Sequence, residues 1–165
     1  LDTAKGIGAV LLTRHLASSI LEPSKVMADA VAWSGTVSGL AAILGHNYPI
    51  WLRFRGGKGV ATSLGVVLAL MPIQSLFVFA IWGCVLAITR YVSLASITAA
   101  LCLPLLALLA QWNDLKGNGG RLPFACIAAL LVVRRHRENI TRLLNGTENR
   151  LGQKKSSPET DPHGN

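Results

Sequence analysis

Acidic residues are scarce in this chain. Only 8 of its 165 residues are Asp or Glu, and charged residues of both signs together make up 15%. Soluble domains usually carry about 25% charged residues. We also find no paired carboxylates that would suit a two-metal phosphotransferase. The composition therefore argues against a soluble domain and against two-metal chemistry.

Cysteine is rare as well. The three cysteines, Cys84, Cys102 and Cys126, lie inside apolar runs, without CxxC or Cys/His spacing. Isolated cysteines in apolar runs usually act as small core residues. The sequence therefore predicts no metal site, and we expect no cofactor.

A third absence concerns histidine. No histidine is followed five positions later by Asp, which is the acid–base pair of the common soluble-faced glycerolipid acyltransferases. Any chemistry must therefore rely on cations and backbone amides, which suits phosphate binding better than proton abstraction. Other residues occupy the fifth position: Ile20 after His15, Trp51 after His46 and Thr141 after His136.

Apolar residues, in contrast, are abundant. They make up 51% of the chain, in long runs that alternate with short basic loops, as is typical of a polytopic membrane protein. We predict an all-α membrane helix bundle with about six spanning or re-entrant helices. Several runs are shorter than the roughly 20 residues that a span needs, above all the third and the sixth. The runs are 6–21, 26–44, 60–71, 73–88, 91–110 and 122–133.

The basic residues predict the orientation. The net charge is +8, and the bases flank the apolar runs, so we interpret them first as positive-inside determinants near anionic lipid and expect no nucleic-acid partner. The loop with Arg53, Arg55 and Lys58 and the basic segment after residue 133 should both be cytoplasmic. Residues 1–150 would form one membrane-embedded domain, and the polar residues 151–165 a disordered tail.

The number of crossings between these two basic segments must be even. The runs at 91–110 and 122–133 carry the chain out and back, so residues 60–88 must also cross an even number of times. One long helix fails this test, whereas two short helices hinged near Pro72 or one re-entrant hairpin satisfy it. The same count places residues 1–5 on the cytoplasmic side.

The one long cytoplasmic loop, GHNYPIWLRFRGGKGVAT, covers residues 45–62. In it, three glycines surround Lys58 just before an apolar helix begins: Gly56, Gly57 and Gly59. Glycines let backbone amides approach an anion closely, and a helix start offers free N–H groups and a positive dipole end. The segment therefore predicts a phosphate cradle, although not a Walker A loop, because glycine follows the lysine. The alternative is a flexible loop with snorkelling bases.

A second polar cluster, RRHRENITRLLNGTE, directly follows the last apolar run. On a helix, His136 and Asn139 share one face. Arg135 and Arg142 share a face with the same asparagine, and Gly146 would end the helix. The alternative is a basic amphipathic helix lying on anionic lipid, which accounts for the arginines better than for the histidine and the asparagine.

A third boundary segment, RYVSLASI, contains Ser93 and Ser96. These hydroxyl groups can hydrogen-bond a ligand. Serines at such boundaries more often cap the helix or bond its backbone, and we expect the structural role more often than the functional one.

Together these segments resemble the bacterial acyl-phosphate:glycerol-3-phosphate acyltransferase family (PlsY type). GHNYPIWLRFRGGKGVAT resembles its second signature, RYVSLASI its segment with a fixed serine, and RRHRENITRLLNGTE its third signature. The opening LDTAKGIGAVLL resembles the start of the helix after the first signature. The first signature and the helix before it would lie upstream of Leu1, so the chain resembles an N-terminally truncated member. One added helix would give the family's seven, and we expect the fragment alone to be impaired.

The resemblance implies a reaction. An acyl group would pass from acyl phosphate to the 1-hydroxyl of sn-glycerol 3-phosphate, giving lysophosphatidic acid and phosphate as the first step of phospholipid synthesis. It implies a multi-pass protein of the bacterial cell inner membrane whose active site faces the cytoplasm. The family is thought to let the substrate's own phosphate accept the hydroxyl proton. We expect acyl phosphate, glycerol 3-phosphate and the lipid bilayer as partners of a monomer.

The resemblance also implies roles for particular residues. Lys58, His136 and Asn139 would be catalytic. Lys58 would neutralise a phosphate and stabilise charge on the attacked carbonyl, while the other two would position glycerol 3-phosphate. The residues expected to bind substrate or phosphate, or to shape the pocket, are Gly56, Gly57, Gly59, Thr62, His46, Asn47, Ser93 and Arg142.

Two other function classes fit the composition. A small transporter for an anionic solute would carry charges at mid-membrane and paired broken helices, but only the Pro72 break hints at this, and the bases lie at boundaries. A non-catalytic membrane-anchored binding subunit would use the basic tail. Turnover of acyl phosphate with glycerol 3-phosphate distinguishes the enzyme from both.

Overall fold

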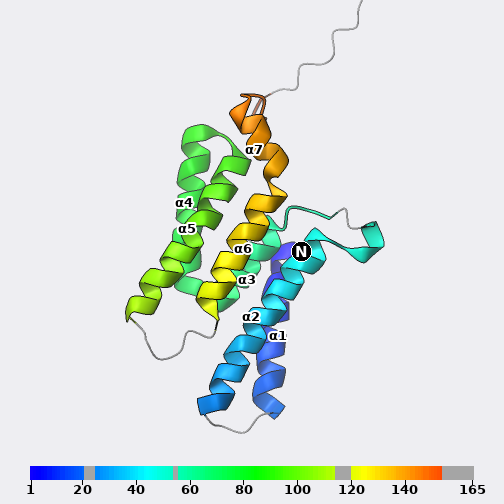
Figure 1. Cartoon of the computed structure of the whole chain (residues 1–165), viewed down its shortest axis with the longest axis vertical. Helices are drawn as coiled ribbons and strands as arrows, with labels where there is room; N and C mark the ends of the chain where they lie inside the picture. The colour runs from blue at the N-terminus through cyan, green and yellow to red at the C-terminus, as the bar shows by residue number, and fades with distance from the viewer. Residues whose placement is uncertain (21–24, 54–55, 114–119, 154–165) are drawn as a thin grey trace, which may run out of the picture.

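The computed structural model describes residues 1–20, 25–53, 56–113 and 120–153. Every regular element among these residues is a helix, which confirms the predicted all-α class (Figure 1). In chain order the elements are α1 (Asp2–Ile20), α2 (Lys25–Asn47), the 3-10 helix η1 (Ile50–Leu52), α3 (Val60–Leu70), α4 (Pro72–Thr89), α5 (Val92–Asn113), α6 (Arg121–Arg135) and α7 (Arg137–Leu144).

Three of the described helices are long and apolar enough to cross a membrane, on length and composition: α2, α4 and α5. Helix α3 is apolar but has only 11 residues. At about 1.5 Å per residue it extends roughly 16 Å, about half the thickness of a hydrocarbon core. The third apolar run is therefore a half-length helix, as its shortness indicated.

Helices α3 and α4 are two antiparallel helices that meet at Met71 and Pro72 (Figure 1). The residue before a proline avoids the helical region, and Met71 has φ −142° and ψ 67°. Pro72 then starts α4, where its missing N–H is not needed. The predicted hinge near Pro72 is confirmed, since residues 60–88 form two helices rather than one.

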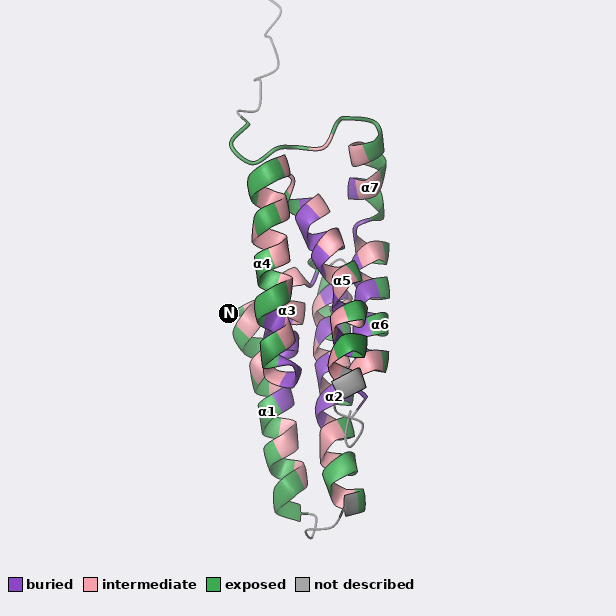
Figure 2. Cartoon of the chain, turned by 90° about the vertical axis from the view of Figure 1, so that its left-hand side faces the viewer, coloured by how far each residue is buried: buried purple, intermediate pink, exposed green. Residues whose placement is uncertain are grey.

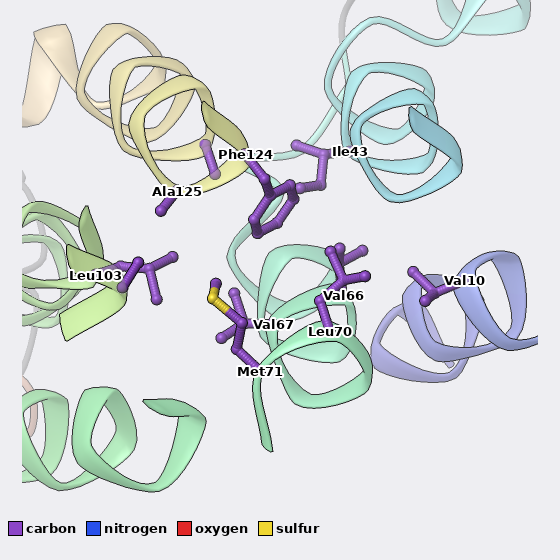
Figure 3. Packing of buried hydrophobic residues seen from close by; sticks show 11 residues of the cluster. Val10, Ile43, Val66, Val67, Leu70, Met71, Leu103, Phe124 and Ala125 are labelled. Carbon is purple, nitrogen blue, oxygen red and sulfur yellow. The ribbon is translucent and has the colours of Figure 1, made fainter. Parts of the chain in front are cut away.

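Helix α3 lies at the centre of the buried core. Figure 3 shows Val66 of α3 facing Val10 of α1, and Ile43 of α2 close to Phe124 of α6. Each of these four side chains is at most 1% exposed. Because helices from both halves of the chain pack around α3, its first turn is held in the middle of the bundle.

Two glycines bring α1 and α3 close together. A Cβ atom on Gly6 would clash with the backbone carbonyl of Thr62, and one on Gly65 would clash with the backbone of Thr3. Small residues commonly allow such close helix contacts in membranes. This packing fixes the position of Thr62 and of the turn that contains it.

Large apolar side chains cover the outer faces of the bundle. On α4, Ile73, Leu76 and Phe77 are 66%, 69% and 56% exposed. Figure 2 shows exposed residues along the outside of α1 and α4, with buried residues turned inward. Such a surface is unfavourable in water and suits contact with lipid tails.

The predicted loop at 45–62 is shorter in the structure. Residues 45–47 complete α2, and residues 60–62 form the first turn of α3. Both ends are helical because Asn47 and Thr62 are packed rather than solvated, each being only 1% exposed. Arg55 and residues 154–165 of the predicted tail lie outside the described residues.

Candidate active site

The glycines of the loop cross directly over the C-terminal end of α2. A Cβ atom on Gly56 would clash with the carbonyl oxygen of His46, and one on Gly57 with the imidazole ring of the same residue. Gly59 has φ +72°, a conformation that side chains disfavour, and a Cβ atom there would clash with the side chain of Asn47. The structure therefore brings the predicted glycines together with His46 and Asn47.

The first turn of α3 provides unoccupied donors beside these glycines. Gly59 is the N-cap, and no side chain caps the helix. The first intrahelical hydrogen bond is donated by Ser63 N to the cap carbonyl, Gly59 O, at 2.8 Å. The N–H groups of the preceding turn can therefore bind an anion, aided by the positive end of the helix dipole. We call residues 56–59 together with this first turn the cradle.

Lys58 projects from the cradle. It is exposed, and it forms no ion pair with any residue in the described part of the chain. Its charge lowers the pKa of His136, so the two predicted catalytic residues from distant parts of the sequence lie near one another. A lysine without a carboxylate partner keeps its full charge for an anionic ligand.

Unpaired polar atoms are buried close to the cradle. Asn47 Oδ1, Thr62 Oγ1 and Ser63 Oγ are buried and have no hydrogen-bond partner among the described residues. Leaving such an atom unpaired costs about 1–3 kcal/mol. These atoms indicate a place where a polar ligand or water is needed to complete the hydrogen bonding.

Arg135, at the end of α6, binds the carbonyl groups of the glycine loop. Its Nε donates to Gly57 O at 2.9 Å, and one terminal nitrogen donates to Gly56 O. Its guanidinium carbon lies 5.3 Å from the ring centroid of Tyr48, which is a cation–π contact. We did not predict Arg135 as a site residue, since its place in a run of bases is equally typical of lipid contact.

His136 lies between α6 and α7 and is only 2% exposed. Its Nδ1 lies 2.8 Å from Val132 O. A carbonyl can only accept, so the neutral ring carries its proton on Nδ1 and leaves Nε2 as an acceptor. Burial, and then the charge of Lys58, lowers the pKa of His136 more than its other neighbours raise it. His136 is therefore a neutral hydrogen-bond acceptor at neutral pH.

The second part of the site centres on Glu148. Its Oε1 accepts hydrogen bonds from Ser93 Oγ and Asn139 Nδ2, both at 2.6 Å, and its Oε2 accepts one from Arg142 Nε at 2.7 Å. Burial alone would raise the pKa of Glu148, but these donors together lower it to about 2. We call Glu148 and its three donors the Glu148 network. We did not predict Glu148 as a site residue, because a single glutamate forms no recognisable sequence pattern.

The second polar cluster departs from the predicted single helix. The helix is interrupted at His136, which has φ −98° and ψ 10°, and α7 begins at Arg137. Arg135 and Arg142 therefore do not share a face: the first binds the glycine loop and the second binds Glu148. The predicted end at Gly146 is confirmed, with φ +69°.

The two serines of RYVSLASI take different roles. Ser93 joins the Glu148 network, whereas Ser96 Oγ donates to Val92 O at 2.8 Å and accepts from Trp82 Nε1 at 3.2 Å. Ser96 therefore has the structural role that such serines usually have, while Ser93 links α5 to the segment after α7.

An apolar cavity of about 320 Å³ opens between α3, α4, α5 and α6. It begins at the cradle, because Val60, the first residue of α3, lines it. Val132, whose carbonyl holds His136, lines it from α6. The remaining wall is formed largely by aliphatic and aromatic side chains, among them Leu64, Val67, Phe79, Trp82 and Leu103. The arrangement can hold a phosphate at the cradle and an attached hydrocarbon chain in the cavity.

Comparisons with known proteins agree on one family. The family model described as glycerol-3-phosphate acyltransferase matches residues 1–146. The glycerol-3-phosphate acyltransferase of Thermoanaerobacter sp. (strain X514) is 40% identical over 154 residues, which cover 93% of this chain and 69% of that protein. The one from Gloeobacter violaceus is 44% identical over 154 residues, which cover 92% of this chain and 67% of that protein.

Two solved structures are similar in fold and sequence. Both are crystal structures of PlsY (YgiH), an integral membrane glycerol 3-phosphate acyltransferase. The lysophosphatidic acid form has a TM-score of 0.74 at 40% identity and covers 92% of this chain and 69% of that chain. The glycerol 3-phosphate form has a TM-score of 0.67 at 41% identity and covers 78% of this chain and 67% of that chain.

Proposed function

This chain belongs to the glycerol-3-phosphate acyltransferase family, and we propose that it transfers an acyl group from acyl phosphate to the 1-hydroxyl of sn-glycerol 3-phosphate. The family match confirms the resemblance of the signatures and the predicted enzyme class. The observation that supports the donor most strongly is the junction of the cradle with the apolar cavity. A phosphate carrying a long acyl chain is complementary to both parts.

The reaction needs little proton chemistry from the protein. The hydroxyl oxygen of glycerol 3-phosphate attacks the acyl carbonyl carbon, the bond from that carbon to the phosphate oxygen breaks, and the phosphate leaves with the hydroxyl proton. Negative charge builds on the carbonyl oxygen and on the departing phosphate. Lys58 and the backbone amides of the cradle stabilise this charge without reorganising.

The predicted site residues take their places in this scheme. Gly56, Gly57 and Gly59 present amides to a phosphate. The neutral His136 offers Nε2 as a hydrogen-bond acceptor that positions glycerol 3-phosphate, together with Asn139, which is held by Glu148. The remaining predicted residues would support these two parts of the site. His46, Asn47 and Thr62 lie at the cradle, and Ser93 and Arg142 bind Glu148.

The acyl chain would occupy the apolar cavity. Each buried methylene group contributes about 0.8 kcal/mol, so the cavity supplies binding energy that holds the reactive carbonyl at the cradle. The lining residue Val60 directly follows Gly59 in the sequence. The carbonyl oxygen of Val132, another lining residue, contacts the ring of His136. Binding energy from the chain is thereby converted into correct orientation of the reacting atoms.

We place the site on the cytoplasmic side of a bacterial inner membrane. The cradle and the basic segment around His136 lie at one end of the bundle, joined by Arg135. Basic residues gather on cytoplasmic surfaces, and glycerol 3-phosphate is a water-soluble metabolite that must reach the site from water. We further propose that the protein acts as a monomer.

A transfer assay tests this proposal. Membranes containing the protein, expressed from its complete gene, receive acyl phosphate and labelled glycerol 3-phosphate. We expect lysophosphatidic acid and inorganic phosphate in equal amounts, and no product from Lys58→Ala although the variant remains in the membrane. Acyl-CoA as the sole working donor would refute the donor assignment, and absence of turnover with every donor would favour a transporter or binding subunit.

A further inference from the structure

We propose that Arg135 is a positioning residue that aims the backbone N–H groups of the glycine loop at a bound phosphate. This inference rests on the proposed phosphate-binding role of the cradle. Arg135 would act through the loop rather than by touching the substrate, since two of its five N–H donors hold the loop carbonyls. It would determine which side of two peptide groups the substrate meets.

The contact with the loop is bidentate. Arg135 donates through Nε to Gly57 O at 2.9 Å and through a terminal nitrogen to Gly56 O. The planar guanidinium group offers its donors in a fixed fork, so the two carbonyl oxygens are held in one relative orientation. Tyr48, stacked on the guanidinium at 5.3 Å, limits how the group can rotate.

Tyr48 in turn is fixed to α2. Its backbone N–H donates to Leu44 O at 2.8 Å, which continues the hydrogen bonding of that helix by one residue. The arginine therefore connects the end of α6, the loop and the end of α2. A single side chain sets the position of the loop relative to both helices.

The direction of the carbonyls determines the direction of the amides. In a trans peptide the C=O of one residue and the N–H of the next point in opposite directions, and the chain has no cis peptide among its described residues. With the Gly56 and Gly57 carbonyls turned toward Arg135, the N–H groups of Gly57 and Lys58 point away from it. These N–H groups donate to no other described backbone carbonyl.

Glycine makes this restraint necessary. Glycine samples both signs of φ readily, so the two peptide groups can turn over at little cost when nothing holds them. A reversed peptide would present a carbonyl oxygen to the phosphate and repel it. The glycines are needed because the loop packs closely against His46, but they do not fix the orientation of their own peptide groups. Arg135 supplies that restraint.

The neighbouring Arg134 provides a matched control. It carries the same charge one residue earlier on α6, and its exposed side chain makes no hydrogen bond or ion pair with the described residues. Long-range attraction of phosphate would depend on both arginines alike. Positioning of the loop would depend on Arg135 only.

The experiment measures kcat and the KM of each substrate for Arg135→Gln, Arg135→Lys and Arg134→Gln in membranes. We expect Arg135→Gln to raise the KM of one phosphate substrate by about tenfold or more, the loss typical of one to two charge-assisted hydrogen bonds, with a smaller change in kcat. The KM that rises identifies whether glycerol 3-phosphate or acyl phosphate occupies the cradle. The KM of Arg135→Lys should lie between those of the unmodified protein and Arg135→Gln, because lysine keeps the charge but lacks the planar fork of donors. Arg134→Gln should stay within about twofold of the unmodified protein.

Three results would overturn the inference. The first is an equal rise in KM for Arg134→Gln and Arg135→Gln, which would leave charge alone as the cause. The second is a reduced kcat for Arg135→Gln with both KM values unchanged. If Arg135→Gln does not accumulate in the membrane, Arg135→Lys decides: a normal KM there excludes a need for the fork, and a raised KM supports it. An inactive unmodified protein would instead contradict the proposed function.

Discussion

The cradle and the Glu148 network both lie near His136, but their hydrogen bonding is opposite. In the Glu148 network each carboxylate oxygen is paired, by Ser93, Asn139 and Arg142. At the cradle the lysine has no ion-pair partner among the described residues, and the buried Asn47 Oδ1 and Thr62 Oγ1 lack hydrogen-bond partners there.

This difference distinguishes a support from a binding surface. A fully paired buried network is rigid and positions the groups attached to it. A set of unpaired donors and acceptors is costly unless a ligand completes it. We therefore expect damage to the Glu148 network to affect the folded protein, and damage to the cradle to affect substrate binding.

Breaking the network should have the largest effect. Glu148→Ala leaves the buried Ser93 and Asn139 without their acceptor, at about 1–3 kcal/mol for each unpaired group. We expect a lower thermal unfolding temperature, less protein in the membrane and loss of transfer. Glu148→Gln, which keeps one acceptor oxygen, should be milder. Unchanged stability in the alanine variant would show that the network is not a support.

Blocking the cradle should have the next largest effect. Gly59→Ala adds a methyl group against the side chain of Asn47 at a position with φ +72°. We expect transfer at limiting substrate to fall at least tenfold, through KM, because a shift of about 1 Å in the loop misplaces its amides. Gly146→Ala is the control, since it has φ +69° but open space around its Cβ position. Equal losses in both variants would assign the effect to backbone strain alone.

Removing an unpaired polar atom should have a smaller effect of opposite sign on stability. Thr62→Val replaces a buried hydroxyl group that has no described partner, so the free protein should unfold at the same or a slightly higher temperature. Substrate affinity should fall by about threefold to tenfold, the range for one neutral hydrogen bond. Thermal unfolding with and without glycerol 3-phosphate measures both. A clear loss of stability without ligand would mean that the hydroxyl is already paired.

A change of pH around neutrality should have the smallest effect of the four. The pKa of His136 is lowered from its ordinary value of 6.5, so its neutral form predominates at pH 7 and above. Protonation on lowering the pH removes the Nε2 acceptor, so the rate should decline only at pH values below 6.5. A decline that begins above pH 7 would contradict the neutral role of His136. His136→Asn should remove this limb from whatever activity remains.

The sequence predicts the cradle better than the Glu148 network for a physical reason. Glycines around a lysine at a helix start are a local pattern, and the interacting groups lie within a few residues of one another. Glu148 meets Ser93 across 55 positions, and Arg135 meets Gly57 across 78. Such distant pairings depend on how the helices pack, which a single sequence does not display.

The helices were predicted for a similar reason. Apolar runs and Pro72 are local features, so the six predicted runs correspond to α1 to α6 and the hinge lies where it was predicted. The ends of the 45–62 segment were wrong because polarity indicated a loop, while Asn47 and Thr62 are polar residues buried in helices. The break at His136 was missed because nothing in RRHRENI resembles a helix terminator.

Glycine-selective NMR of the labelled protein in lipid discs, titrated with glycerol 3-phosphate and with acyl phosphate, tests the central claim most directly. If the cradle binds phosphate, the amide signals of Gly57 and Gly59 should shift on saturable addition of at least one of the two, and those of Gly146 and Gly152 should not. Saturable binding without any shift at Gly57 or Gly59 would contradict the account.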